Sequence, residues 1–165
     1  GLTSGYIPMG AVLFNDRIAA VLRDQGGELA HGYTYSGHPV CAAVALENIR
    51  ILQDENILET CRNETGPYLA ERWQALGEHP LVGEARIAGM VGALELVPDK
   101  GVRRFFEDRG KVGALCRTMA LKNGLILRAT NDSMLLSPPL TINRTEIDEL
   151  FEKAWKSLNE TAEAI

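Results

Sequence analysis

The sequence has 165 residues, of which 45% are hydrophobic, and its formal net charge at pH 7 is −5. This length suffices for one compact core, or for one small domain together with a piece of another. The negative charge, with no Lys/Arg run longer than Arg103-Arg104, argues against a nucleic-acid partner, and the apolar runs are too short to predict a membrane-spanning helix.

The cysteines and histidines are few and scattered. Cys41, Cys61 and Cys116 are odd in number and too widely spaced for a zinc knuckle, so we interpret them as reduced thiols of a cytoplasmic protein. The histidines do not combine with cysteines or carboxylates at metal-ligand spacing, and we expect no metal site. No basic segment followed by an apolar one opens the chain, so no signal peptide is predicted.

The first third of the chain predicts short elements around a long loop. Residues 11–14 (AVLF) predict a strand, and residues 18–22 (IAAVL) predict a short helix or a second strand. Residues 26–38 are rich in Gly, Ser, Thr and Tyr and predict a loop. Pro39 suits a first helical turn, and the small apolar residues after it predict a well-buried helix start.

The middle of the chain predicts a helical region followed by strands. The helical region covers about residues 55–77, with Trp73 as a core candidate, and Gly66-Pro67 is expected to kink or split it. Residues 82–97 alternate in part between apolar and polar side chains and carry several glycines. They predict two antiparallel strands or one bent strand.

The last third predicts two helices that flank a pair of strands. A helix over about residues 111–122 should end at Asn123-Gly124, a common C-terminal signature. Strands are predicted at residues 125–128 and 134–136, on either side of the polar turn at residues 130–133.

A final helix follows these strands. Asn143 and Glu146 have the spacing of a capping box, and Trp155 lies on the apolar stripe that continues from them. Helices and strands therefore interleave, with small antiparallel strands late in the chain. This order indicates the end of an α/β layer followed by an α+β domain.

A hydroxyl-rich loop, residues 31–39, leads into the helix that Pro39 opens. The N-terminus of a helix offers free backbone N–H groups and the positive end of the helix dipole, which suits a phosphate. A simple turn and helix cap explains the same residues, because such caps are common.

Arg128 is the second candidate for a binding role. It follows an apolar stretch and comes just before a polar turn, where an arginine can present its planar fork to a carboxylate. A structural or surface ion pair with one of the many acidic residues is the alternative that the residues alone leave open.

Several stretches resemble the class III aminotransferases, which depend on pyridoxal phosphate (PLP). Residues 1–12 (GLTSGYIPMGAV) resemble the segment that directly follows the cofactor-bearing lysine of that family. Residues 33–39 (YTYSGHP) resemble the conserved loop of its ω-amino acid and amine:pyruvate branch, and the Thr-Ser-Gly-Tyr stretch at residues 3–6 is similar to the same branch. Residues 124–129 (GLILRA) and 137–140 (SPPL) look like its C-terminal signature.

This resemblance implies a fold-type I transferase. Residues 1–54 would complete the large PLP-binding domain and begin the helix between domains, and residues 55–165 would form the small C-terminal α+β domain. The lysine that carries PLP would come immediately before Gly1, so the chain is interpreted as a C-terminal segment that holds no catalytic residue. By itself it is expected to be inactive as a transaminase.

The resemblance also assigns roles to three residues. The Thr34 hydroxyl and the Tyr33 backbone would bind the PLP phosphate of the neighbouring subunit, which implies a homodimer, and Arg128 would bind a carboxylate of the substrate or keto acid. The implied reaction moves an amino group from a primary amine or ω-amino acid to a keto acid, with pyruvate as the expected acceptor.

Two other interpretations stay open beside this one. The chain could belong to a non-catalytic product, such as a truncated remnant or a dimer-forming fragment. It could instead belong to another class III enzyme with a different PLP chemistry, such as an aminomutase or a decarboxylating aminotransferase.

Overall fold

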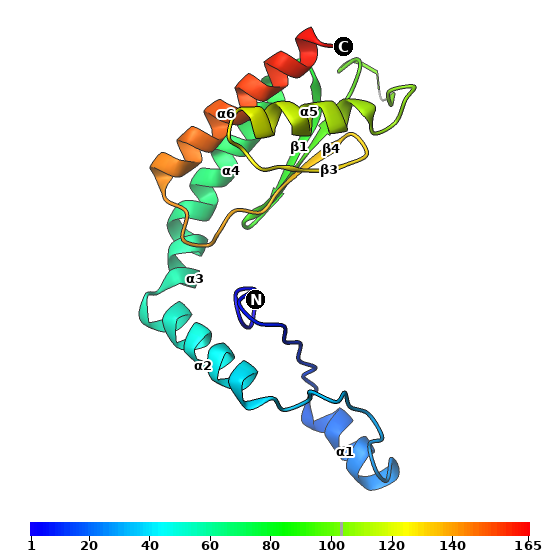
Figure 1. The fold of residues 1–165 in the computed structure, drawn as a ribbon, viewed down its shortest axis with the longest axis vertical. Coiled ribbons are helices and arrows are strands. Elements are labelled where there is room, and N and C mark those ends of the chain that lie inside the picture. Colours follow the sequence, from blue (N-terminus) through cyan, green and yellow to red (C-terminus); the bar gives the residue numbers. More distant parts are fainter. Residues whose placement is uncertain (103) are drawn as a thin grey trace. The chain divides into compact units, whose positions relative to one another are not determined.

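Helices and loops make up the first part of the chain, and an antiparallel sheet with helices packed against it makes up the second (Figure 1). The computed structural model describes residues 1–102 and 104–165. They divide into two units, Gly1–Asn56 and Ile57–Ile165.

The first unit contains two helices, α1 (Asp16–Gln25) and α2 (Pro39–Asp54). The side chain of Asn15 caps α1 by accepting a hydrogen bond from the backbone N–H of Ile18 at 3.2 Å. Residues 18–22, for which the sequence predicts either a short helix or a strand, are thus part of a helix. The predicted helix start at Pro39 is confirmed, with the proline in the first turn.

Two expectations for this unit are wrong. Residues 11–14 do not form a strand, and Val12 and Leu13 are 85% and 88% exposed. A strand needs a neighbour for its N–H and C=O groups, and Gly1–Asn56 contains no strand that could pair with this stretch. The start of α2 is not well buried either, because Ala45 is the one buried residue of this helix. Within its unit, α2 is hydrogen-bonded to the opening segment of the chain through Asn48.

The second unit begins with a helical region that is split where Gly66-Pro67 predicts it. Helix α3 (Ile57–Thr60) passes into a π-helical turn (Cys61–Thr65), and α4 (Gly66–Ala75) follows. The N–H of Gly66 bonds the carbonyl of Cys61, five residues earlier. Since Pro67 has no N–H to donate, the chain widens by one residue per turn at this place and then resumes an α-helix.

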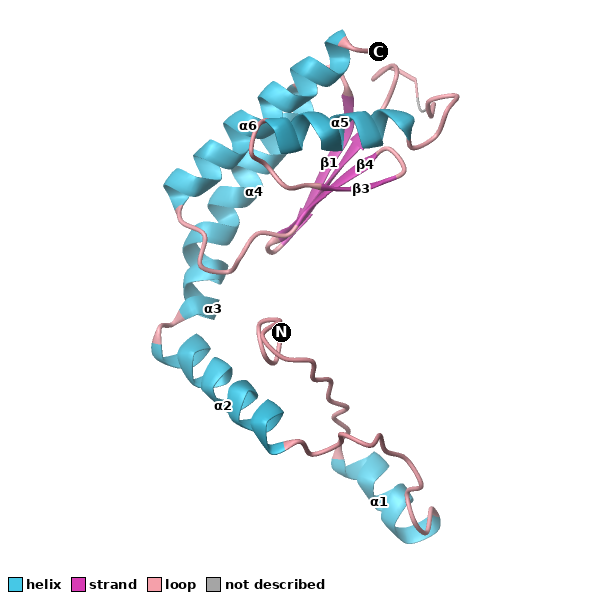
Figure 2. Ribbon diagram, viewed as in Figure 1, coloured by secondary structure: helices cyan, strands magenta, loops and turns pink. Residues whose placement is uncertain are grey.

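In the part of the chain that the structure describes, the sheet has four antiparallel strands in the order β1-β2-β4-β3 (Figure 2). Their bounds are Val82–Ala88 (β1), Val91–Leu96 (β2), Arg128–Thr130 (β3) and Ser133–Leu136 (β4). The first two strands form the hairpin that the alternation predicts. Thr130 pairs with Ser133 around the predicted polar turn.

The strand predicted at residues 125–128 is placed wrongly, because β3 begins only at Arg128. The N–H of Leu125 donates to the carbonyl of Ala120 at 2.8 Å, so this residue completes the end of a helix instead of joining the sheet. Gly124 lies between them with φ +73°, the left-handed conformation that ends helices.

That helix is α5 (Lys111–Lys122), and the last helix is α6 (Arg144–Glu163), as predicted. The capping box at the start of α6 is confirmed: Asn143 Oδ1 accepts from the N–H of Glu146 at 3.0 Å, and Glu146 Oε2 accepts from the N–H of Asn143 at 2.9 Å. Two of the unpaired backbone donors of the helix start are therefore satisfied.

Replacing Asn143 by alanine removes the side-chain half of this capping box. We expect the free energy of unfolding to fall by about 1 kcal/mol, the usual loss for a helix N-cap. Urea unfolding followed by circular dichroism measures the change. A Thr145→Ala variant serves as control, because Thr145 is exposed in the first turn and takes no part in the box. Equal stability of the two variants would contradict the expectation.

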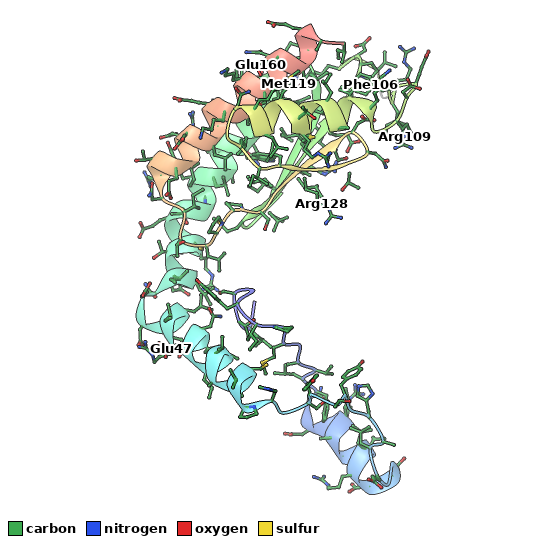
Figure 3. All side chains as sticks on the ribbon, viewed as in Figure 1. Glu47, Phe106, Arg109, Met119, Arg128 and Glu160 are labelled. Carbon is green, nitrogen blue, oxygen red and sulfur yellow. The ribbon has the colours of Figure 1, made fainter. Side chains whose placement is uncertain are left out.

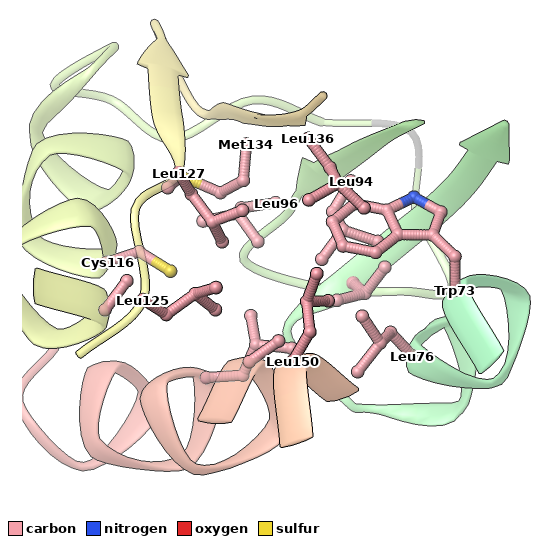
Figure 4. Packing of buried hydrophobic residues seen from close by; sticks show 14 of the residues in the cluster. Trp73, Leu76, Leu94, Leu96, Cys116, Leu125, Leu127, Met134, Leu136 and Leu150 are labelled. Atoms are coloured by element: carbon pink, nitrogen blue, oxygen red, sulfur yellow. The ribbon is translucent and has the colours of Figure 1, made fainter. Parts of the chain in front are cut away.

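The core lies between one face of the sheet and helices α4, α5 and α6 (Figure 4). Trp73 of α4 is 1% exposed, and its indole N–H points to the carbonyls of Arg86 (3.1 Å) and Ala93 (3.4 Å) on the β1–β2 hairpin. The expected core position of Trp73 is confirmed. Trp155 is only half-buried and packs edge-on against His79.

Candidate functional site

The opening segment of the chain is fixed onto α2 by one asparagine. The side-chain amide of Asn48 donates to the carbonyls of Gly1 (3.0 Å) and Leu2 (3.1 Å), and its oxygen accepts from the Ser4 hydroxyl at 2.6 Å. The Thr3 hydroxyl closes the segment by donating to the carbonyl of Ile7 at 2.6 Å. Sequence reasoning missed Asn48, because an asparagine within a helix carries no signal for a contact 46 residues away.

A tight turn over residues 33–36 forms most of the hydroxyl-rich loop. The N–H of Ser36 donates to the Tyr33 carbonyl at 2.9 Å, and the Ser36 hydroxyl accepts from the N–H of Tyr33 at 2.9 Å. Gly37 then takes φ +71°, which lets the chain reverse into the start of α2. The loop is thus preformed by its own bonds.

Thr34 lies at the exposed corner of this turn. Within the part of the chain that the structure describes, its hydroxyl and the backbone N–H groups of Thr34 and Tyr35 have no hydrogen-bond partner. The N–H of Tyr33, by contrast, is already occupied by Ser36. Tyr33 and Tyr35 are 79% and 80% exposed. The turn therefore presents three free donors to the outside, in front of the N-terminus of α2.

The two motifs of the first unit lie on the same hollow. This hollow of about 450 Å³ is lined by residues 7–10 of the opening segment and, across from them, by Tyr33, Tyr35–His38 and the first turn of α2. Thr34 stands at the same turn but does not line the hollow. The sequence could not predict this meeting, since the two stretches are separated by α1.

Arg128 is the first residue of β3, the edge strand of the sheet in the second unit. It pairs with Leu135 of β4, while its neighbour Ala129 pairs with the buried Met134. Since side chains alternate along a strand, Arg128 lies on the face opposite to the core. Figure 3 shows its guanidinium directed away from α5. It is exposed and has no hydrogen bond or ion pair to any residue that the structure describes.

Arg86 lies in the same row of that sheet face but is fully engaged. Its guanidinium bonds Glu84 at 2.8 Å and lies 3.5 Å from Glu95, whose carboxylate also accepts from the Ser133 hydroxyl. The hydrogen bond to Glu84 raises the pKa of the Arg86 guanidinium above its usual range. Of these two arginines, Arg128 is therefore the one that is available to an external carboxylate.

Among residues 1–102 and 104–165, no three His, Cys, Asp or Glu side chains come together in a way that could hold a metal ion. None of the helices in these ranges combines the length and the apolar character that crossing a bilayer requires. Burial raises the pKa of the Cys116 thiol, which is typical of an inert core cysteine.

Comparison with known proteins gives a consistent result. Residues 1–158 match the sequence model of the family Aminotransferase class-III. All 165 residues align with 36% of the putrescine–pyruvate aminotransferase of Pseudomonas aeruginosa, with 61% identity. The diaminobutyrate–2-oxoglutarate transaminase of Halomonas elongata is 39% identical over 171 aligned positions, which cover the whole chain and 36% of that protein.

Solved structures agree with these sequence matches. The chain superposes on a transaminase with L-alanine at a TM-score of 0.94 and 37% identity, covering 99% of this chain and 39% of that one. An ω-transaminase from Pseudomonas jessenii gives a TM-score of 0.92 and 36% identity, with coverage of 99% and 37%. The chain thus spans about a third of the length of its relatives. It belongs to the class III aminotransferases, PLP-dependent enzymes of fold-type I, and to their ω branch, as the resemblance of its motifs predicts.

Proposed function

We propose that this chain is part of a transaminase that moves an amino group from a primary amine or ω-amino acid to pyruvate. The observation that carries the proposal is the 61% identity to a putrescine–pyruvate aminotransferase over every residue of the chain. Residues 1–54 would complete the large PLP-binding domain and residues 55–165 would form the small domain, in a cytoplasmic homodimer. By the same likeness, a diamine such as putrescine is the expected donor.

The turn at residues 33–36 suits the phosphate of PLP. The Thr34 hydroxyl and the free N–H groups of Thr34 and Tyr35 are the donors that a phosphate requires, and the N-terminus of α2 adds its dipole. The Tyr33 N–H could join them once the Ser36 hydroxyl releases it. The exposure of this turn supports a phosphate shared with a neighbouring subunit. Bound PLP supplies the electron sink for amino transfer.

Arg128 would bind the carboxylate of the keto acid. A guanidinium without an internal partner can form two parallel hydrogen bonds to a carboxylate, which fixes the orientation of the keto group as well as its position. A diamine has no carboxylate, so the same arginine would contribute little to binding the donor. A change at Arg128 is therefore expected to alter the kinetics with the keto acid and leave those with the diamine nearly unchanged.

A direct assay tests the proposed reaction. The full-length protein that contains this chain is expected to form alanine from pyruvate when putrescine or a related amine is the donor. Chromatography of the reaction mixture measures the alanine formed. The 165-residue chain alone is expected to form none. Absence of any amino acid product with every amine and keto acid tried would favour a non-catalytic remnant. Isomerised product formed without a keto acid, or release of CO2 from the donor together with amino transfer to the keto acid, would favour another class III chemistry.

Replacing Thr34 by alanine tests the phosphate site. We expect PLP affinity of the full-length protein to fall roughly tenfold or more, because a hydrogen bond to a charged group contributes about 1.5–3 kcal/mol. Titration of the cofactor-free protein with PLP, followed by absorbance, measures it. Thr118→Ala is the matched control, since the exposed Thr118 hydroxyl bonds the Ala114 carbonyl of its own helix. Equal PLP affinity in both variants would refute the role of Thr34.

A further inference from the structure

The turn between β3 and β4 caps a helix that lies elsewhere in the chain. Asp132 is 3% exposed, and its carboxylate accepts from the N–H of Gly110 (2.9 Å) and from the N–H of Gly113 (2.9 Å). These are two donors at the start of α5, whose own N-cap residue, Gly110, has no side chain to offer. A carboxylate in this place also interacts favourably with the helix dipole.

The same turn lies against the helix backbone. A Cβ atom on Gly113 would come within 2.0 Å of the Asn131 carbonyl oxygen, so only glycine permits this approach. Asn131 itself adopts φ +50°, which closes the two-residue turn. The backbone carbonyl of Asp132 also accepts a hydrogen bond from the N–H of Leu96 in β2 at 2.9 Å. The turn is thus bonded to α5 and to the centre of the sheet.

Strand β3 depends on that turn for its register. It has three residues, lies at the sheet edge and is paired only with β4. Arg128 is its first residue, at the end away from the turn. The buried Leu127 holds the backbone on one side of Arg128, and the register set at the turn holds it on the other.

We propose that Asp132 is a positioning residue for Arg128. Its two bonds to α5 fix the turn, the turn fixes the register of β3, and β3 aims the guanidinium at the carboxylate of the keto acid. The inference rests on the proposed function, because it requires Arg128 to bind that carboxylate. Two parallel hydrogen bonds need a fixed approach, and a displacement of about 1 Å can cost a large factor in rate.

The test measures kcat/KM of the full-length enzyme separately for pyruvate and for putrescine. We expect Asp132→Ala to lower kcat/KM for pyruvate roughly tenfold while the value for putrescine stays within about twofold. Asp132→Asn keeps one of the two acceptors and is expected to lower the pyruvate value about threefold, a partial rescue. Should the alanine variant fail to fold, the ratio of kcat/KM for pyruvate to kcat/KM for putrescine in the asparagine variant tests the proposal.

Two further variants distinguish a failure of the positioning role of Asp132 from a failure of the proposed role of Arg128. Asn143→Ala removes a cap from a different helix and is expected to leave the pyruvate-to-putrescine ratio unchanged. If the Asp132 variants lower both values in proportion, or neither, while Arg128→Ala lowers only the pyruvate value, Asp132 has no positioning role and the proposed function stands. If Arg128→Ala also leaves the ratio unchanged, the assignment of Arg128 fails with it.

Discussion

Arg128→Ala is expected to lower kcat/KM for pyruvate about 100-fold in the full-length enzyme, with PLP still bound. The loss corresponds to roughly 2.7 kcal/mol, which is what two charge-assisted hydrogen bonds to a carboxylate can contribute. Because Arg128 has no internal partner among the described residues, its removal leaves no buried group unsatisfied and should not affect folding. Steady-state kinetics with pyruvate and putrescine varied in turn provide the measurement.

Arg86→Ala is the matched control for this prediction. Arg86 lies on the same sheet face, but its guanidinium is engaged with Glu84 and Glu95. Its loss should leave kcat/KM for pyruvate within about threefold and change stability by less than about 1 kcal/mol, as is usual for an exposed ion pair. Arg128→Lys keeps the charge without the planar fork and should recover only part of the activity. Equal kinetics of the Arg128→Ala and Arg86→Ala variants would overturn the role of Arg128.

Trp73→Ala is expected to have the largest effect on stability, lowering the free energy of unfolding by about 3–5 kcal/mol. The indole is almost completely buried, bonds the β1–β2 hairpin through its N–H, and lies where Gly92 leaves room for it. A Cβ on Gly92 would come within 2.7 Å of the indole nitrogen, so the position of the ring requires a glycine at residue 92. Urea unfolding of the full-length protein by circular dichroism measures the loss.

Two variants test the reason for that loss. Trp155→Ala removes the same side chain from a half-buried position and should cost clearly less. Trp73→Phe keeps a ring in the core but removes the hydrogen bonds to the Arg86 and Ala93 carbonyls, and should fall between wild type and the alanine variant. If Trp155→Ala proved as destabilising as Trp73→Ala, burial would not explain the effect.

Elements with strong local signals could be predicted from the sequence. The capping box at Asn143 and Glu146, the helix end at Asn123-Gly124 and the interruption at Gly66-Pro67 all occur where expected, because each depends on bonds within a few residues. The strand predicted at residues 125–128 is placed wrongly because no such local bond marks where it begins. Its apolar pattern suits a strand or a buried helix-to-strand connection equally, and only packing distinguishes them.

Burial could not be predicted in the first unit. The apolar residues of 11–14 and of α2 suggested a covered strand and a covered helix, yet most of them are exposed within Gly1–Asn56. Hydrophobic periodicity reports which residues favour burial, whereas burial itself requires a partner surface. Thr34 and Arg128 could be named as candidates from their surroundings in the sequence, and their roles stay predictions until the variants are measured.

The family could be recognised from the amino-acid sequence alone, since its motifs are short and occur in a defined order. The elements with local caps and turns could be predicted in the same way. The three-dimensional structure was needed to reveal that Asn48 holds the opening segment and that Asp132 caps α5. It also shows that Arg128 has no side-chain partner among residues 1–102 and 104–165, whereas Arg86 has two. These facts depend on contacts between residues far apart in the chain. Such contacts are decided by packing and register, which no local pattern encodes.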